Sequence, residues 1–445
     1  MAAGRVCEAT LPEERVFRGG ACYRLRVDRK HPCIWEPRLK LCVFGVTAVN
    51  SGATTFFFYY LYFHTRQRFG FGETQNLLLA AALGYIYAGS SYLAGNFAQR
   101  FGNFFSIRFG MVTMVAAMTA ASFASGLWVF LALIAVTNFG MCFCWPALEG
   151  LMSVGEPPAR LQSLVGMYSI SWATAGAVAY FTGGALLEHL GESALYYAPV
   201  ATIIAELIFL SWFERAVARQ RGPRPDLAHS ALEVIAEGDA SPIPAKTFLQ
   251  MGWLANPMAY LVVNTVVSTI PSLAERFGFE KMTAGFVCSV WLFSRAASFV
   301  ALRMWPRWHY RFRFLAFGYV AMILSFAVML IIPNVWTLVV SQLVLGAALG
   351  LMYYSSLFYS MDVGETKSEH GGIHEAAIGL GSGSGPAIAA GSVALFPASP
   401  ASGPIGVSVL LLGGFAALMR LRFRTTNGDA KGGDLKPRRD TEAHG

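Results

Sequence analysis

Charged residues are scarce in this chain. Asp, Glu, Lys and Arg make up 13% of its 445 residues, whereas a soluble domain carries about 25%. Hydrophobic residues make up 55%. A water-soluble fold needs more polar surface than this, so the composition excludes a soluble protein and favours one embedded in a membrane.

Several motifs that would indicate other protein classes are also missing. The seven cysteines form no CxxC pair, so we expect reduced thiols and no disulfide framework. Residues 1–38 contain no apolar stretch, so no cleavable signal peptide is expected. The chain has no GxxxxGK[ST] loop and no HEXXH, GxSxG or HxxxxD constellation. We therefore expect no catalytic residues, no cofactor and no ATP hydrolysis in this chain.

Long apolar stretches are present instead. Each is close to the roughly 20 residues that cross the hydrocarbon core as a helix, and none alternates as a barrel strand would. The sequence therefore predicts an all-α membrane protein with twelve transmembrane helices. The spans cover residues 41–62, 76–94, 106–124, 127–149, 162–187, 196–213, 251–272, 283–302, 312–332, 335–358, 374–396 and 404–419.

The basic residues alternate between the two sides of these spans. Of the 34 Lys and Arg residues, 29 lie in or beside the two terminal segments and the even-numbered loops, and 4 lie in the odd-numbered loops. Positive charge near span ends stays in the cytoplasm, so both termini are expected there. Arg295 is the one cation left deep inside a span. Because the cations of this +8 chain border the membrane, we expect contact with lipid and no nucleic-acid partner.

A polar linker divides the spans into two sets of six, and the sets resemble each other. At an offset of 209, Val154-Gly155-Glu156 aligns with Val363-Gly364-Glu365, and Trp145 aligns with Tyr354. Such duplicated halves are typical of alternating-access carriers. The predicted organisation is a disordered basic N-terminal tail (1–38), a first half (39–213), a linker (214–250), a second half (251–424) and a C-terminal tail (425–445).

The loop after the second span carries a recognisable motif. Over residues 39–424 the chain resembles the major facilitator superfamily, whose pattern here is Gly-x-Leu-Ala-Asp-Arg-x-Gly-Arg-Lys. Gly95, Ala98, Arg100 and Gly102 match it, but Gln99 stands where the family has Asp, and the final basic pair is absent. The resemblance implies a small-molecule carrier in which this loop contributes to the cytoplasmic gate. It makes Gly95, Arg100 and Gly102 gating candidates.

Polar residues inside spans are the candidates for the substrate pathway. Arg295 must be offset by a partner or water, because an Arg at a helix centre costs about 2.5–3.5 kcal/mol on insertion scales. It would either bind substrate or pair with another helix. Asn138, Trp145 and Glu149 share one helical face and suggest a substrate wall. Alternatively, Glu149 ends its helix at the cytoplasmic boundary.

Three further residues are pathway candidates. Asn50 and Asn264 are amides about halfway along spans that the resemblance places beside the cavity, and unpaired amides in hydrocarbon are unfavourable. Tyr354 occupies the place of Trp145 in the second half. Aromatic faces with a few hydrogen-bonding groups suit many small metabolites.

Gating or coupling is expected of charged groups near the cytoplasmic turns. These residues are Glu156, Arg160, Glu365, His374 and Glu375. His374 and Glu375 would form a proton-responsive gate, or they would belong to a solvated loop and helix start.

The same segment contains two histidines that could suggest a metal site. His370 and His374 have a helical spacing of four that suits a metal, but Gly371 and Gly372 lie between them. We therefore assign no metal site.

The sequence as a whole predicts a monomeric carrier in an inner or plasma membrane. It would move a small solute by alternating access, coupled to protons or to the gradient of the solute itself. Two other classes remain open: a receptor or assembly protein that keeps the carrier fold without transporting, and a membrane-embedded transferase. Loss of polar cavity residues would indicate the former, and clustered catalytic residues the latter.

Overall fold

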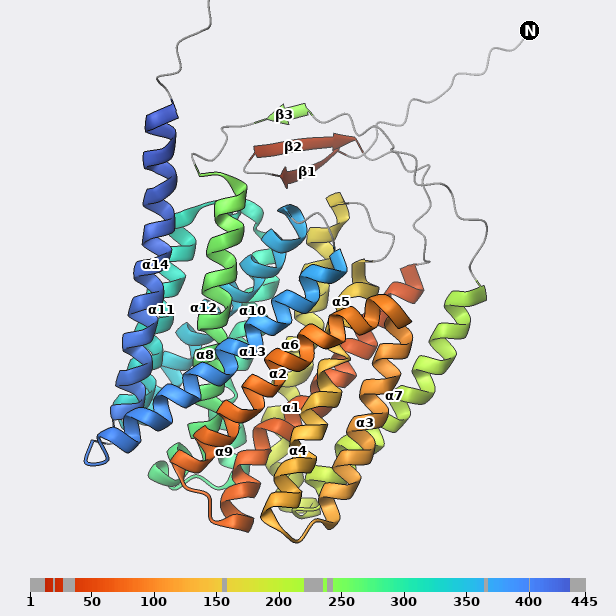
Figure 1. The fold of residues 1–445 in the computed structure, drawn as a ribbon, viewed down its shortest axis with the longest axis vertical. Helices are drawn as coiled ribbons and strands as arrows, with labels where there is room; N and C mark the ends of the chain where they lie inside the picture. Colours follow the sequence, from red (N-terminus) through yellow and green to blue (C-terminus); the bar gives the residue numbers. More distant parts are fainter. Residues whose placement is uncertain are drawn as a thin grey trace, which may run out of the picture.

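Helices form nearly all of the regular structure in the computed structural model (Figure 1). It describes residues 13–18, 21–26, 37–153, 158–219, 235–237, 243–363, 367–399 and 401–432. Within these residues, twelve helical segments are long and apolar enough to cross a membrane. They fall on the twelve spans predicted from the sequence, so the predicted fold class is confirmed.

The first six spans contain α1 to α7, and the last six contain α8 to α14. The first set is α1 (Pro37–Phe69), α2 (Glu73–Phe101), α3 (Asn103–Phe123), α4 (Leu127–Cys142), α5 (Trp145–Ser153), α6 (Pro158–Leu190) and α7 (Ala194–Arg219). The second is α8 (Ala245–Phe277), α9 (Lys281–Cys288), α10 (Val290–Met304), the 3-10 helix η1 (Pro306–Trp308), α11 (Phe312–Ile331), α12 (Val335–Val363), α13 (Lys367–Leu395) and α14 (Ser402–Gly432).

The fourth span is divided into α4 and α5 at a short turn. Phe143 and Cys144 donate backbone hydrogen bonds three residues back, to Gly140 and Met141, rather than four. Pro146 follows at the start of α5 and has no N–H to continue the helical ladder. The break sets the direction of the helix that carries Trp145 and Glu149.

Three short strands were not expected. β1 (Glu13–Arg18) and β2 (Ala21–Arg26) form an antiparallel pair, and β3 (Ile235–Glu237) adds to β2 with Cys22 opposite Glu237. This corrects the expectation that residues 1–38 are disordered throughout. The Gly19-Gly20 pair between the two runs is a hairpin signal in the sequence, but the pairing with a strand 200 residues away has no local signal.

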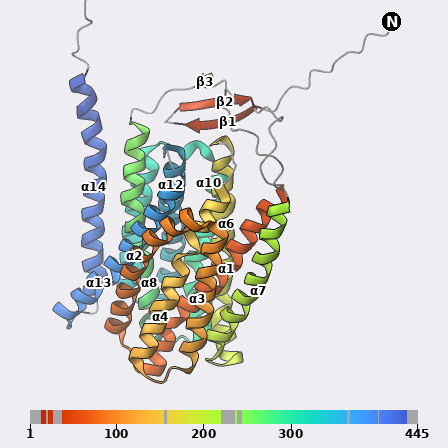
Figure 2. The same cartoon turned by 45° about the vertical axis from the view of Figure 1, so that its right-hand side comes forward.

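The sheet lies over the end of the bundle at which α7 ends and α8 begins, as both views show (Figures 1 and 2). We call this the linker end and the other the far end. α1 begins and α14 ends at the linker end (Figure 1), as an even number of spans requires. The helix ends that adjoin the terminal segments and the even-numbered loops lie at this end, and the sequence has 29 of its 34 cations in or beside those segments and loops.

Helices α2 and α13 bring the two sets of spans into direct backbone contact. A Cβ atom added at Gly84 would lie 2.2 Å from the backbone nitrogen of Gly383, and one at Gly379 would lie 2.4 Å from the backbone nitrogen of Ala88. Small residues allow this approach because no side chain separates the helices. The contact runs from mid-span to the linker end, where Gly95 faces Gly372.

This contact predicts that the stability of the protein is sensitive to substitution at some glycines of α2 and not at others. Gly84→Ala should destabilise the protein by about 1–3 kcal/mol, because overpacking at backbone contacts forces the helices apart. Gly89→Ala is the matched control on the same helix, because nothing lies within 4 Å of a Cβ added there. Thermal unfolding in detergent measures both variants. Equal melting temperatures for the two variants would contradict the packing described.

Candidate functional site

A cavity of about 180 Å³ lies between the two sets of spans. Helices α1, α2, α4, α5 and α6 line it from the first set, and α8, α10, α12 and α13 line it from the second. Four residues predicted for the substrate pathway lie on its wall: Asn138, Trp145, Asn264 and Arg295. The structure thus brings together polar groups that lie more than 150 residues apart in the chain.

The three other predicted pathway residues lie outside this wall. Asn50 is fully buried and neighbours Glu206 of α7. Tyr354 packs against Phe299 and Trp308, while Tyr353, one position earlier, lines the cavity. Glu149 lies in a separate buried cluster near the cavity.

Arg295 of α10 is held among aromatic rings. It is 3% exposed, and one guanidinium nitrogen donates to the hydroxyl of Tyr260 at 3.1 Å. Its Cζ atom lies 4.5 Å from the ring centroid of Trp172 and 5.4 Å from that of Tyr353. Cation–π attraction in a desolvated site contributes about 2 kcal/mol or more. Within the described part of the chain Arg295 forms no ion pair, and its Nε atom has no hydrogen-bond partner.

This aromatic cage could not be predicted from the sequence. Trp172, Tyr260 and Tyr353 come from α6, α8 and α12, and single aromatic residues in apolar spans give no sign of pointing inward. The rings also contact one another: the centroid of Trp172 lies 5.2 Å from that of Tyr353. Only the assembled fold shows that they surround one cation.

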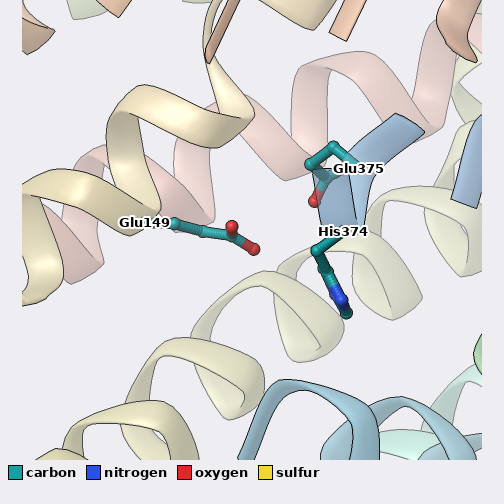
Figure 3. Close-up of side chains that lie close together, drawn as sticks. All are labelled: Glu149, His374 and Glu375. Atoms are coloured by element: carbon teal, nitrogen blue, oxygen red, sulfur yellow. The ribbon is translucent and has the colours of Figure 1, made fainter. Parts of the chain in front are cut away.

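A second group of functional side chains joins α5 to α13 (Figure 3). Glu149 points from α5 toward Glu375 and His374 near the start of α13, and ligand atoms of the three lie within 4.8 Å of one another. The three residues are 3–4% exposed. The sequence assigned Glu149 to a substrate wall and the other two to a gate, but in the structure they form one cluster. Glu375 also lines the cavity.

Hydrogen bonds satisfy only part of this cluster. Tyr87 donates to a carboxylate oxygen of Glu375 at 2.5 Å, and Ser356 lies 3.4 Å from Nδ1 of His374. Both oxygens of Glu149 and Nε2 of His374 are buried without a hydrogen-bond partner. Two carboxylates and an imidazole are a donor set that can exchange protons, and one that can also hold a divalent metal.

The sequence of this chain matches the model of a known protein family. The sequence model of the Major Facilitator Superfamily matches residues 42–386. The chain belongs to the major facilitator superfamily. It is therefore a multi-pass integral membrane protein of a transporter family. A search of curated proteins gave no match.

Solved transporter structures share this superfamily fold. One is a bacterial homolog of the human lysosomal transporter Spinster, inward-facing and unoccupied, with a TM-score of 0.56, 14% identity, and coverage of 87% of this chain and 96% of the other. A mutant of the nucleoside transporter NupG has a TM-score of 0.63 and 12% identity, with coverage of 87% of this chain and 99% of the other. The human organic anion transporter MFSD10 (TETRAN) has a TM-score of 0.62 and 14% identity, with coverage of 86% of this chain and 100% of the other. At these identities the likeness concerns the fold.

The superfamily motif covers the last turns of α2 and the junction with α3 at the linker end. Gly102 has a φ of 92°, a conformation that favours glycine because it has no Cβ. Gly95 contacts Gly372 of α13, and the guanidinium of Arg100 lies over the Phe101 ring. Arg160 is in α6, and Glu156 and Glu365 lie outside the described residues. Their gating roles remain predictions.

Ionic contacts join the two sets of spans at the far end. The pairs are Arg66 with Glu275, Arg276 with Glu73 (3.1 Å), and Lys281 with Glu192. At the linker end, Arg303 of α10 donates to Ser163 of α6 at 3.2 Å. Contacts between the halves therefore lie on both sides of the cavity.

Glu192, at the far end, is expected to make the stability of the protein depend on pH. Hydrogen bonds from His64 and Lys281 lower its pKa from the ordinary value of 4.5, against the opposing effect of burial. Because the folded pKa is depressed, this stabilisation is present above about pH 4.5 and is lost as the pH falls through the folded value. The melting temperature of the wild type should exceed that of Glu192→Gln at pH 7, and the gap should close in acid. A gap independent of pH would contradict this assignment.

Proposed function

We propose that this protein is a secondary carrier that moves a small solute across the membrane by alternating access. The observation that supports this most strongly is the cavity, whose wall combines Arg295, Asn138 and Asn264 from both halves. Inter-half contacts on both sides of the cavity are the contacts that a rocking motion would break in turn.

The charge asymmetry supports an orientation. The terminal segments and the loops that adjoin the linker end hold 29 of the 34 basic residues of the sequence, so this end would face the cytoplasm of an inner or plasma membrane, with both termini inside. The halves would comprise residues 39–213 and 251–424, and the carrier would act as a monomer. Nothing in this proposal requires a catalytic step or a nucleic-acid partner.

We further propose that transport is coupled to protons through Glu149 and Glu375. The first belongs to α5 and the second to α13, so their contact forms and breaks as the halves move. Two carboxylates this close in a buried site repel each other unless at least one is protonated. Proton binding therefore favours the joined arrangement, and separation of the helices favours proton release.

A metabolite screen in reconstituted vesicles tests this function. Purified protein would be placed in liposomes, and a panel of radiolabelled sugars, nucleosides, amino acids and organic acids would be offered with and without an imposed proton gradient. At least one solute should accumulate in a gradient-dependent manner, and Arg295→Ala should lose that uptake. If no class accumulates in vesicles whose protein is folded, the carrier assignment fails in favour of a receptor that only retains the fold.

A further inference from the structure

Two residues on the cavity wall carry buried hydrogen-bond donors that lack acceptors. Nε of Arg295 and Nε1 of Trp172 are both buried without a partner, and both residues line the cavity. The two groups are adjacent, because the guanidinium lies 4.5 Å from the Trp172 ring centroid. A buried donor without an acceptor costs about 1–3 kcal/mol, and more when it is charged. A ligand that supplies acceptor atoms at this point would remove that cost.

Four other polar residues on the wall each donate a hydrogen bond to a protein acceptor. Ser51 donates to the carbonyl oxygen of Trp172 at 2.8 Å, and Thr54 donates to that of Asn50 at 2.8 Å. The amide of Asn264 donates to Ser382 at 2.9 Å, and that of Asn138 donates to the Leu83 carbonyl oxygen at 2.8 Å. Among the described residues of the wall, the side-chain donors that are buried without a partner are those of Arg295 and Trp172.

The charge at this point is also uncompensated. Arg295 has no ion pair within the described residues and rests against rings instead. The carboxylate on the same wall, Glu375, already accepts a hydrogen bond from Tyr87. A buried guanidinium favours an anion that can accept two hydrogen bonds, such as a planar carboxylate or a tetrahedral sulfonate. A cationic solute would be repelled.

The rest of the cavity limits the body of the solute. Its volume of about 180 Å³ equals that of about six water molecules, below the roughly 300 Å³ at which pockets for drug-sized ligands begin. Aromatic side chains, among them Phe58, Tyr59 and Tyr62, line it beside Trp145. Such rings pack well against a flat apolar group.

We propose that the cavity binds a small organic monoanion, whose acid group pairs with Arg295 and Trp172 and whose planar apolar body lies among the aromatic side chains. This inference rests on the proposed transport function, because it names the class of solute that the same cavity carries.

Calorimetric titration of the purified wild type in detergent tests this with four probes. Benzenesulfonate carries both the permanent charge and the ring. Benzenesulfonamide is a nearly isosteric neutral control, methanesulfonate lacks the ring, and benzyltrimethylammonium is a cation. Benzenesulfonate should bind saturably and at least about thirty-fold more tightly than the sulfonamide, because the neutral sulfonamide leaves the buried guanidinium without an ionic partner. Methanesulfonate should bind more weakly, and the cation should not bind.

Three variants locate the binding site. Arg295→Gln should weaken benzenesulfonate binding at least about thirty-fold, and Trp172→Phe, which keeps a ring but removes the N–H, should weaken it about two- to ten-fold. Arg420→Gln is the matched control, because Arg420 is exposed on the peripheral helix α14. It should bind as the wild type does. The probe series on the wild type remains informative if Arg295→Gln fails to fold.

The outcomes separate this inference from the transport proposal. Binding of benzenesulfonate in detergent without uptake in vesicles would support the anion site and remove the carrier function. Uptake of a neutral or cationic solute by vesicles, with no benzenesulfonate binding, would support the carrier function and remove the anion site. The anion site is overturned if no saturable benzenesulfonate binding occurs, if the sulfonamide or the cation binds as tightly, or if Arg295→Gln binds with wild-type affinity.

Discussion

Replacement of Glu149 by Gln is expected to abolish the pH dependence of uptake. The wild-type rate should change by up to about ten-fold per pH unit where a single proton is transferred, since one pKa unit corresponds to 1.36 kcal/mol. Glutamine has nearly the same shape but cannot exchange a proton. The variant should therefore carry solute along its own gradient without responding to a proton gradient.

The structural reason lies in the surroundings of Glu149. It is 3% exposed, and both its oxygens lack hydrogen-bond partners. An ionised carboxylate in such a site is strongly unfavourable unless a cation or a proton accompanies it. Glu375 and His374 are the carboxylate and the imidazole beside it. Tyr168 and Tyr353 are close enough to interact with it electrostatically, and Arg295 is the cation on the cavity wall.

The matched control for this variant is Glu206→Gln. Glu206 of α7 is also buried with both oxygens unpartnered, but it neighbours Asn50 rather than the cavity. Uptake by this variant should keep the wild-type pH profile. Uptake assays with and without a metal chelator distinguish coupling to protons from coupling to a divalent ion, because Glu149, His374 and Glu375 could bind either. An unchanged pH profile in Glu149→Gln would remove Glu149 from coupling.

Replacement of Arg295 by Ala is expected to reduce transport at least about thirty-fold while leaving membrane insertion intact. Removal of one partner from a buried charge pair costs about 2–5 kcal/mol, and this loss falls on solute binding. Insertion should not suffer, because an Arg at a helix centre opposes insertion by about 2.5–3.5 kcal/mol. Initial uptake rates, normalised to inserted protein, measure the effect.

Arg295→Lys refines this prediction. Lysine keeps the charge but lacks the planar fork that stacks on rings and donates to two acceptors. Transport should therefore lie between those of the wild type and Arg295→Ala. Wild-type rates in Arg295→Ala would show that the cation serves only to pack α10 against Trp172 and Tyr353.

The sequence predicts the fold well because membrane spans depend on local composition. Span length and apolarity need no tertiary information, and all twelve spans coincide with helices. The pairing of β2 with β3 depends on a long-range contact, which composition does not encode. The Gly19-Gly20 pair is a local signal for the β1–β2 hairpin, but nothing local in the sequence indicates β3.

The site is only partly readable from the sequence. A charge or an amide inside a span stands out, and this signal led to Asn138, Asn264 and Arg295, which the structure places on the cavity wall. Internal repeat alignment pointed to Tyr354 where Tyr353 lines the cavity, because a shift of one residue turns a helix face by about 100°. The meeting of Glu149 with Glu375 required the packing of α5 against α13.

Accessibility of the cavity from both sides is the most direct test of alternating access. Thr55 lines the cavity, so Thr55→Cys would be prepared with the native cysteines replaced by alanine and treated with a membrane-impermeant thiol reagent. Ser122→Cys, partly exposed in the last turn of α3 at the far end, is the one-sided control. We expect Thr55→Cys to be labelled from either side of the membrane and Ser122→Cys from one. Labelling of Thr55→Cys from a single side only, in vesicles of both orientations, would contradict a carrier that rocks about this cavity.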